Sequence, residues 1–431
     1  MRRLAIAFVV LALGLAGCRG GSTSPGGGGN NAGGVKTDIG VTKEACPQAV
    51  NANHGCIYLG SISDLTSGPF KALAVPITES QKAFWARVNK AGGIGNYDVD
   101  VTTYVRDNKY NPEVHNQVYQ EIKGKVLALA QTLGSPTTAA IINDLKTNKI
   151  VAAPASWTSA WAFEDVIIES GANYCIESMN ALDYAKEAWQ PKSVMAVHYP
   201  GDYGDDAAAG VKLGAEALGM AFTNVKTDSG QDKQAGAIDA ILAKKPDVVV
   251  LTTGPADAAL IIGQTAAHGY TGKFIGTSPT WNPGLLQHPA AAAIKALYVQ
   301  TAPWNAWSAD TPGHKAMREA IGTSVTPNDG YTAGWVWSYP LKAALEKAVK
   351  DGDLTRDGLL KAVKSLSSVD YEGMLPAGAG NFAGGPDAQV RVTAIYKPDP
   401  SGPTGVSQVK DLFVGPTAKA YKLDKPCFQK L

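Results

Sequence analysis

The residues of this chain best suited to hold a small molecule form the run Gly134-Ser135-Pro136, which follows an apolar segment. Pro136 suits the first position of a helix, where its missing N–H is not needed, and Ser135 suits the N-cap before it. The free N–H groups and the dipole of a helix N-terminus attract negatively charged groups. The run therefore predicts a carboxylate-binding site at Ser135, with a capped helix end that faces solvent as the alternative interpretation.

The sequence contains no motif that indicates an enzyme active site. No G-x-S-x-G elbow, S-x-x-K, G-x-G-x-x-G or G-x-x-x-x-G-K-[ST] motif occurs in a suitable context. Asp205 and Asp206 are adjacent carboxylates, but at a predicted helix start such residues more often stabilise the helix dipole. The formal net charge of +1 gives no basic surface for nucleic acid. We expect neither enzyme activity nor a cofactor, and an exported hydrolase is the enzyme alternative.

The N-terminus has the organisation of an export signal. Arg2 and Arg3 precede an apolar run at 4–15, which is too short to span a bilayer permanently. The run Leu15-Ala16-Gly17-Cys18 resembles the lipobox of bacterial lipoproteins, in which the cysteine takes a lipid and becomes the mature N-terminus. We therefore expect a signal peptide at 1–18, lipidation of Cys18 and a body anchored outside the cell membrane. A secretory peptide with an incidental cysteine is the alternative.

A Gly-rich stretch follows, and we expect a flexible tether at 19–45. Arg19 stands directly after Cys18, where an Asp would act as a retention signal for a Gram-negative inner membrane. The outer face of a Gram-positive membrane is therefore favoured, with the periplasm as the location in a Gram-negative host. About 400 residues remain, more than one hydrophobic core usually serves, so two lobes are expected.

Four cysteines remain in the body, and an even number in an exported chain indicates two disulfides. Three pairings are possible. We favour Cys46–Cys56, which closes a short local loop, and Cys175–Cys427, which would hold the C-terminal tail. A metal site is the competing interpretation. No C-x-x-C or H-E-x-x-H motif occurs and the six histidines are scattered, so we expect no metal.

The body alternates short apolar strands with amphipathic helices. Strands are expected at 57–62, 98–106, 126–132, 150–154, 193–199, 221–226, 247–252 and 273–276. Helices are expected after Thr78 and Gln81, which are spaced as a capping box, and at 111–123, 136–147, 205–218, 234–244 and 256–268. This alternation predicts an α/β fold with two doubly wound parallel sheets. Ligands of such folds bind at the carboxyl ends of strands, so we expect a ligand in the cleft between two lobes.

Six runs occur in order along the body: LTSGPF at 65–70, VNKAGGIG at 88–95, VRDNKYNP at 105–112, LGSPTTAA at 133–140, VAAPAS at 151–156 and GDYGDD at 201–206. Together they resemble the signatures of type I periplasmic-type solute-binding proteins, in the leucine/isoleucine/valine-binding group that serves ABC importers. The resemblance implies two Rossmann-like lobes joined by three crossovers, which close over a small-molecule solute. It also implies permease and ATPase partners on separate chains, and we expect a monomer that binds no nucleic acid.

The resemblance places lobe one at 46–175 and 304–378, and lobe two at 176–303 and 379–431. It also indicates residues that contact the solute. Ser135 and Thr138 would hold an α-carboxylate, and Ala155 would offer its backbone. Trp157 stands where the family usually has a small hydroxyl residue, so its ring lines the pocket or packs in the core, and the same alternatives apply to Trp161. Further candidates in loops that face the cleft in the family are Phe70, Tyr203, Gly254 and Tyr331.

One loop departs from the family pattern. Amino-acid binders of this group carry a carboxylate after the strand at 273–276 to pair with the ligand ammonium, whereas this chain has Ser278 and, nearby, Trp281. A buried ammonium without a counter-charge costs several kcal/mol. Either Asp202 or Asp257 therefore supplies the charge, or the solute lacks a primary ammonium.

The missing carboxylate and the added tryptophans narrow the class of solute. We expect an amino-acid-like solute, an apolar or aromatic carboxylate, or an amide. An aromatic cage for a quaternary ammonium is a further option. A sensor that presents its closed form to a receptor is the alternative to an importer.

Overall fold

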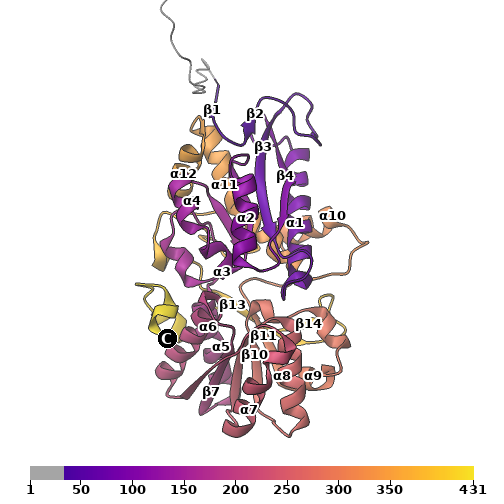
Figure 1. The fold of residues 1–431 in the computed structure, drawn as a ribbon, viewed down its shortest axis with the longest axis vertical. Coiled ribbons are helices and arrows are strands. Elements are labelled where there is room, and N and C mark those ends of the chain that lie inside the picture. The colour runs from indigo at the N-terminus through magenta and orange to yellow at the C-terminus, as the bar shows by residue number, and fades with distance from the viewer. Residues whose placement is uncertain (1–33) are drawn as a thin grey trace, which may run out of the picture.

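The computed structural model describes residues 34–431, so the expected signal peptide, Cys18 and most of the tether lie outside the described residues. The body consists of two α/β lobes, which lie one above the other in Figure 1, and each is built around its own sheet. This is the two-lobed doubly wound architecture that the alternation of strands and helices predicts.

The sheet of lobe one has β3 (Gly55–Ser63) between β4 (Tyr97–Asp107) and β5 (Ala128–Leu133), with β6 (Ala152–Ala155) beyond β5. These four strands are parallel. The helices of this lobe are α1 (Lys71–Lys90), α2 (Pro112–Ile122), α3 (Ser135–Ala139), α4 (Ile142–Asn148), α10 (Pro312–Ile321), α11 (Asp329–Lys350) and α12 (Arg356–Lys364).

Lobe one also includes part of the expected tether. β1 (Lys36–Thr37) pairs with β12 (Asp353–Leu354), and β2 (Val41–Thr42) pairs antiparallel with the beginning of β3. Residues 36–42 are thus hydrogen-bonded into the lobe, and the ordered body begins before residue 46, where the sequence suggested its boundary. Neither pair of residues has the length or periodicity by which a strand is recognised in a sequence.

Helix α1 begins earlier than the sequence indicates. The expected capping box is wrong, because Thr78 lies inside the helix, where its hydroxyl donates to the carbonyl of Ala74 at 3.0 Å. Pro76 is an internal residue of this helix. Its missing N–H leaves the Ala72 carbonyl free, and the side-chain amides of Asn282 and Asn328 approach that oxygen at 3.4 and 3.5 Å. Tertiary contacts therefore satisfy the group that proline would otherwise leave unpaired.

The sheet of lobe two has seven strands in the order β14-β13-β11-β10-β9-β7-β8. The parallel strands are β7 (Ser193–His198), β8 (Ala221–Lys226), β9 (Val248–Thr252), β10 (Lys273–Gly276) and β11 (Tyr298–Ala302). Two antiparallel strands, β13 (Thr393–Pro398) and β14 (Val406–Phe413), complete one edge. The helices are α5 (Tyr174–Trp189), α6 (Asp202–Leu218), α7 (Ala235–Lys244), α8 (Pro255–Ala267), α9 (Ala291–Leu297) and α13 (Pro416–Ala420).

The chain passes between the lobes three times, after β6, after β11 and between α12 and β13. The described structure is closed at its cleft. The Phe70 ring of lobe one lies 5.8 Å from the Tyr203 ring and 6.4 Å from the Tyr199 ring of lobe two, measured between centroids. The carboxyl ends of the strands of both lobes therefore face one another across a covered space.

Both favoured disulfides are confirmed. Cys46 is bonded to Cys56, and Cys175 at the start of α5 is bonded to Cys427, 252 residues later. The backbone N–H of Cys427 donates to the Ser159 hydroxyl at 2.7 Å, and that hydroxyl in turn donates to Asp206 of α6. The disulfide thus attaches the C-terminal tail to the first crossover between the lobes.

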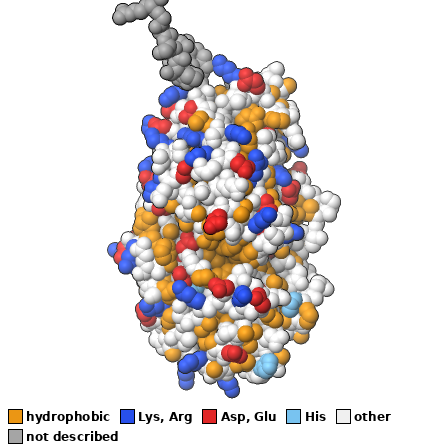
Figure 2. All heavy atoms as spheres, viewed as in Figure 1, with side chains coloured by type: hydrophobic (Ala, Val, Ile, Leu, Met, Phe, Trp, Pro, Cys, Tyr) orange, Lys and Arg blue, Asp and Glu red, His pale blue; other side chains and the backbone are white. Residues whose placement is uncertain are grey.

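The outer surface mixes both signs of charge, while apolar atoms gather at the waist between the lobes (Figure 2). Within residues 34–431, no helix combines the length and the apolar character needed to cross a membrane. In the same residues, no group of three or more His, Cys, Asp or Glu side chains is arranged to hold a metal ion.

Candidate ligand-binding site

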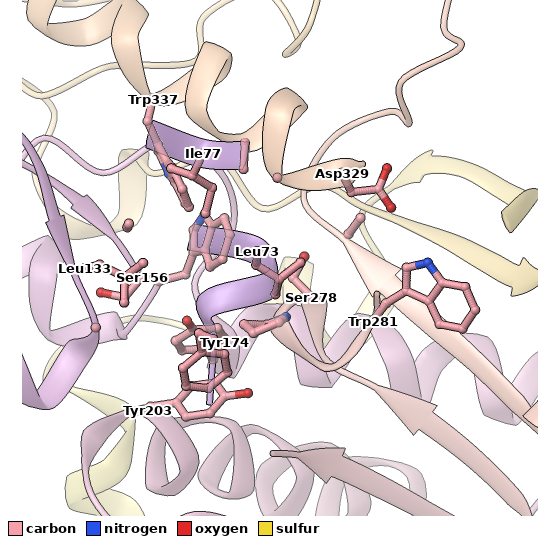
Figure 3. A pocket seen from close by; sticks show the side chains of 18 of the residues that line it. Leu73, Ile77, Leu133, Ser156, Tyr174, Tyr203, Ser278, Trp281, Asp329 and Trp337 are labelled. Carbon is pink, nitrogen blue, oxygen red and sulfur yellow. The ribbon is translucent and has the colours of Figure 1, made fainter. Parts of the chain in front are cut away.

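A pocket lies between the two lobes, and its empty space, with the mouth included, is about 710 Å³. This size is usual for a small-molecule site. Most of its wall is aromatic or aliphatic (Figure 3). The apolar wall consists of Phe70, Leu73, Ile77, Tyr110, Leu133, Ala155, Trp157, Tyr174, Tyr203, Pro279, Trp281, Ala302, Trp304, Ala333 and Trp337. The remaining lining residues are Gly134, Ser135, Ser156, Ser278, Gln300, Asp329 and Gly330, so no Lys or Arg of the described chain lines the pocket.

Helices α1 and α11 form one side of the pocket. Leu73 and Ile77 are one helical turn apart on α1, and the apolar face of α11 lies against them. The two helices approach closely at glycines of α11. A Cβ atom on Gly330 would lie 2.6 Å from the Leu73 carbonyl oxygen, and one on Gly334 would lie 2.2 Å from that of Ile77. These positions therefore require glycine for the helices to meet.

Three tryptophans form a continuous wall at the hinge side of the pocket. The centroid of the Trp157 ring lies 5.1 Å from that of Trp304 and 4.7 Å from that of Trp337. The Trp157 ring nitrogen donates to the Ser170 carbonyl at 2.7 Å, which fixes the orientation of the ring. Because the rings touch one another, they leave no space between them for a quaternary ammonium. The wall offers a flat apolar surface rather than an aromatic cage.

Ser135 lines the pocket, but its expected role as an N-cap is wrong. The N-cap is Gly134, with φ at 98°, and Ser135 is the first residue of the helix. A positive φ suits glycine, so the helix starts one residue earlier than the position of Pro136 suggests. Because the Ser135 hydroxyl does not cap the helix, it has no hydrogen-bond partner among residues 34–431, although the side chain is only 1% exposed. It is available to a ligand.

Seven of the ten ligand-binding candidates line this pocket, and three do not. The seven are Phe70, Ser135, Ala155, Trp157, Tyr203, Ser278 and Trp281. Thr138 is fully buried behind the strand and hydrogen-bonds to the Thr132 hydroxyl at 2.9 Å. Gly254 donates its N–H to the Tyr199 hydroxyl at 2.8 Å, and Tyr331 packs on Trp307, with 5.6 Å between ring centroids.

Trp161 is also away from the pocket. Its ring nitrogen donates to the Ser156 hydroxyl at 3.0 Å, and the ring packs in a hydrophobic cluster of lobe one. Core packing, which was one of the two expected outcomes for this residue, accounts for its position.

The loop that lacks the family carboxylate has an acid beneath it. Glu177, in the first turn of α5, accepts a hydrogen bond from the Ser278 N–H at 2.9 Å and another from the Thr301 hydroxyl. Its second oxygen, Oε2, is buried and has no partner in the described chain. Burial raises the pKa of Glu177 to about 7, and the two hydrogen bonds only partly oppose this. Glu177 does not itself line the pocket.

Asp202 and Asp257, which could have replaced the carboxylate of the family, lie outside the pocket. Asp257 accepts hydrogen bonds from the Tyr199 hydroxyl at 2.6 Å and from the Gly230 N–H at 2.9 Å. Asp202 stands at the start of α6, and burial raises its pKa to about 6. Neither side chain lines the pocket.

Several residues that line the pocket were not predicted from the sequence. Trp304, Trp337 and Tyr174 belong to the second crossover, the middle of α11 and the start of α5, and only the fold brings them together. Asp329 and Gln300 carry oxygens that are buried without a partner in the described structure. The one signal in the sequence was its nine tryptophans.

Comparison with known proteins agrees with this architecture. A family model described as periplasmic binding protein matches residues 57–396. No curated protein matches the chain. Among solved structures, a fatty acid ABC transporter substrate-binding protein from Thermomonospora curvata is similar with a TM-score of 0.82 and 28% identity, over 90% of this chain and 97% of the other.

Two further solved structures share the fold at lower identity. A branched chain amino acid ABC transporter protein from Thermus thermophilus with bound valine has a TM-score of 0.70 and 16% identity, over 85% of this chain and 98% of the other. A leucine binding protein from Thermotoga maritima has a TM-score of 0.69 and 16% identity, over 84% and 99%. The family model matches most of the body, and the structure has two lobes with a pocket between them. The chain therefore belongs to the periplasmic binding protein family, in the type I architecture of the solute-binding proteins of ABC transporters.

Proposed function

We propose that this protein captures a small solute with an apolar body and a carboxylate or amide head, and delivers it to an ABC permease driven by an ATPase on a separate chain. The observation that supports this most is the pocket, whose wall is largely apolar and has no Lys or Arg among the described residues. The solved relative with 28% identity is named as a fatty acid binder, which is the same chemical class.

The head group would be held by neutral donors at the start of α3. The Ser135 hydroxyl is free, and the N–H groups of Ser135 and Thr137 have no acceptor within residues 34–431. Three neutral donors can hold a carboxylate or the oxygen of an amide. Thr138, Gly254 and Tyr331 remain predicted contacts that would require an arrangement other than the closed one described.

A thermal-shift screen followed by titration calorimetry tests the proposal. The panel contains straight-chain carboxylates of 4 to 16 carbons, aromatic carboxylates, their amides, and leucine, isoleucine and valine. A ligand at a hundred times its Kd stabilises the folded protein by about 2.7 kcal/mol, which such a screen detects readily. We expect the apolar carboxylates or amides to stabilise the protein more than the branched-chain amino acids.

The opposite result would contradict the proposal. Tight binding of leucine or valine alone, unchanged by Ser278→Ala, would show that the counter-charge is supplied elsewhere and that the ordinary substrates of the leucine/isoleucine/valine group are bound. Permease and ATPase genes beside this gene would favour import, and a kinase gene there would favour the sensor alternative.

We also propose that Cys18 carries a lipid that anchors the body outside the cell membrane. Apart from residues 36–42, which pair with strands of lobe one, the proposed lobe boundaries are close to 46–175 with 304–378 and 176–303 with 379–431. Cys18→Ser is expected to move the protein from the detergent phase to the aqueous phase in a detergent partition of whole-cell extract. Partition of both proteins into the aqueous phase would contradict lipidation.

A further inference from the structure

A second, smaller pocket lies at the hinge, between the first and the third crossover of the chain. Its empty space, with the mouth included, is about 310 Å³. The first crossover, between β6 and α5, contributes Glu169 and Gly171 to its wall, and the third crossover, between α12 and β13, contributes the other lining residues. None of the residues that line this hinge pocket also lines the solute pocket.

Ser170 separates the hinge pocket from the solute pocket. Its carbonyl accepts the ring N–H of Trp157, in the wall of the solute pocket, at 2.7 Å. Its hydroxyl lies 3.1 Å from the hydroxyl of Tyr371, which lines the hinge pocket. A Cβ atom on Gly171 would lie 2.9 Å from the Cβ of Pro303, which follows β11 at the start of the second crossover. All three crossovers therefore meet beside the hinge pocket, which is a separate site from that of the solute.

The wall of the hinge pocket has one group that ordinarily carries a charge, the carboxylate of Glu169. The residue is only 7% exposed, and neither of its carboxylate oxygens has a hydrogen-bond partner within residues 34–431. A buried acceptor without a donor is costly, and more so when it carries a charge. The carboxylate therefore lacks a donor that the described chain does not supply.

The Glu169 carboxylate lies next to two residues from the opposite wall of the hinge pocket, Gln389 and Tyr371. Burial raises the pKa of Glu169 well above its ordinary value, the Asp206 carboxylate adds to this rise, and the Gln389 amide opposes it. Burial chiefly, with the charge of Glu169 added to it, raises the pKa of Tyr371. The side-chain oxygen of Gln389 already accepts from the Asn173 amide at 3.3 Å. The carboxylate is thus placed among groups of the pocket wall, none of which completes a hydrogen bond to it.

Asp206, the other buried acid near Glu169, is satisfied by the protein itself. It accepts the backbone N–H of Ser159 at 2.9 Å and that of Cys175 at 3.3 Å, as well as the Ser159 hydroxyl. Asp206 therefore needs no further donor, and Glu169 is the acid of this region that does.

We propose that the hinge pocket is a second binding site, which takes a small organic cation with an ammonium or guanidinium group and pairs it with Glu169. The rings of Tyr371 and Phe382 belong to the same wall, and aromatic faces attract such cations. The donor set suits an organic cation better than Ca²⁺, which takes roughly six to eight oxygen ligands. The wall offers one carboxylate and the side-chain amides of Asn381 and Gln389.

The charge of the compound matters more than its ability to donate a hydrogen bond. In the empty pocket Glu169 keeps its proton more readily than an exposed glutamate, because burial disfavours the ionised form. A cation beside the carboxylate stabilises the ionised form and gains a charge-assisted hydrogen bond. A neutral compound of the same size gains only an ordinary hydrogen bond, so charge is the property that the test varies.

Ethylammonium and guanidinium chloride are the cationic probes, and ethanol and acetamide are neutral probes of similar size, with sodium chloride added to equalise the ionic strength. Titration calorimetry at about pH 8, where the proton is removed from Glu169 more easily than at neutral pH, gives the Kd values. The proteins are the wild type, Glu169→Gln, and Val390→Phe, which keeps the carboxylate and reduces the space in the pocket. The exposed Glu216→Gln is the control. The melting temperature of each protein without probe identifies a defect of folding.

We expect at least one cation to bind the wild type ten-fold or more tightly than either neutral probe. Glu169→Gln should weaken that cation at least ten-fold and change the neutral probes less than two-fold. Val390→Phe should also weaken the cation, and Glu216→Gln should leave its Kd unchanged. If Glu169→Gln does not fold, the comparison of Val390→Phe with Glu216→Gln decides.

Three results would overturn the inference. Neutral probes that bind as tightly as the cations would show that charge is not recognised. A cation that binds Glu169→Gln or Val390→Phe as tightly as it binds the wild type would show that it binds elsewhere. Binding of no cation would mean that Glu169 simply keeps its proton in an empty or hydrated pocket. None of these results affects the proposed function, because the solute screen reports on the other pocket.

Discussion

The role of Ser135 depends on which residue caps helix α3. A serine that caps its own helix has a satisfied hydroxyl, whereas the hydroxyl of Ser135 has no partner in the described chain because Gly134 takes the N-cap position. The glycine gives the backbone its positive φ and leaves the serine side chain to the pocket. The function of this residue therefore depends on its neighbour.

Ser135→Ala is expected to weaken solute binding about 5- to 10-fold, since one neutral hydrogen bond contributes about 1 to 1.5 kcal/mol. The melting temperature without solute should hardly change, because no protein partner is lost. Titration calorimetry and thermal unfolding measure the two effects separately. Thr138→Val is the matched control: it removes a hydroxyl bonded to Thr132 and should lower stability more than affinity. A Ser135→Ala protein with unchanged affinity would exclude this serine as a head-group contact.

Glu177 gives a pH-dependent contribution to stability. Its pKa in the folded protein is about 7, compared with an ordinary value of 4.5. Between these pH values the folded protein holds a proton that the unfolded chain has released, so the stability due to protonated Glu177 falls as the pH rises and is lost once the pH passes about 7. Glu177→Gln keeps an oxygen that can accept from Ser278 and Thr301 and removes the titration.

We therefore expect the free energy of unfolding of wild type relative to Glu177→Gln to decline from pH 4.5 to pH 7 and to level off above it, as measured by urea unfolding over this range. The exposed Glu216→Gln serves as the control for the same substitution at the surface. A constant difference across the range would mean that Glu177 is ionised throughout in the folded protein.

The two lobes approach each other closely at the start of helix α8, where a small residue is needed. Gly254 precedes α8 in lobe two, and a Cβ atom there would lie 3.0 Å from the Tyr199 hydroxyl and 3.3 Å from the Cβ of Pro69 in lobe one. Both contacts are tighter than usual for a side chain. The start of α8 and the loop before α1 therefore meet only because this position has no side chain.

Gly254→Ala is expected to weaken solute binding about 5-fold, because overpacking by one methyl group costs roughly 1 kcal/mol and is felt most in the closed form. Calorimetry gives the affinity, and thermal unfolding without solute shows whether the substitution disturbs the fold itself. Gly236→Ala on α7 is the control, since nothing lies within 4 Å of its added Cβ. Equal affinity in Gly254→Ala and wild type would show that closure does not bring these two loops together in solution.

The elements also show what a sequence reveals and what it does not. Strands such as β8 and β10 match the expected limits at both ends. The start of α1 was missed because Thr78 and Gln81 have the spacing of a capping box. The true start lies before Pro76, and Asn282 and Asn328, more than 200 residues away, approach the carbonyl that this proline leaves free. The expected helix at 136–147 is interrupted between α3 and α4 at Ala140 and Ile141. We find no local signal in the sequence for that interruption.

The lining of the pocket could likewise be predicted only in part. Residues that follow strands, such as Ala155 and Ser278, could be identified because the ends of parallel strands meet at one edge. Trp337 and Asp329 could not, because they lie on a helix of the second chain segment of lobe one, and their position depends on how α11 packs on α1. Local patterns specify the strand ends, whereas long-range packing selects the helix face that completes the wall.

For the whole molecule, closure predicts a change of shape on binding. The described form has its lobes in contact through Phe70, and the pocket lies between them. A ligand that contacts both lobes shifts an open population towards this form. We expect small-angle X-ray scattering to give a smaller radius of gyration with a saturating apolar carboxylate than without it. Coinciding profiles would mean that the protein is already closed without solute, or that binding needs no closure, and either would contradict the clamp mechanism.

The bond between Cys175 and Cys427 also has a consequence for how the protein is made. If the chain is exported from its N-terminus, as the proposed signal peptide implies, Cys175 emerges first and its partner follows 252 residues later. A molecule cut short before Cys427 would keep a free thiol in α5 and would lack the tail that holds the first crossover. On a body that begins after Cys18, a thiol-reactive dye should therefore label chains that lack Cys427 and spare chains that contain it, so labelling reports whether the C-terminal tail has been attached.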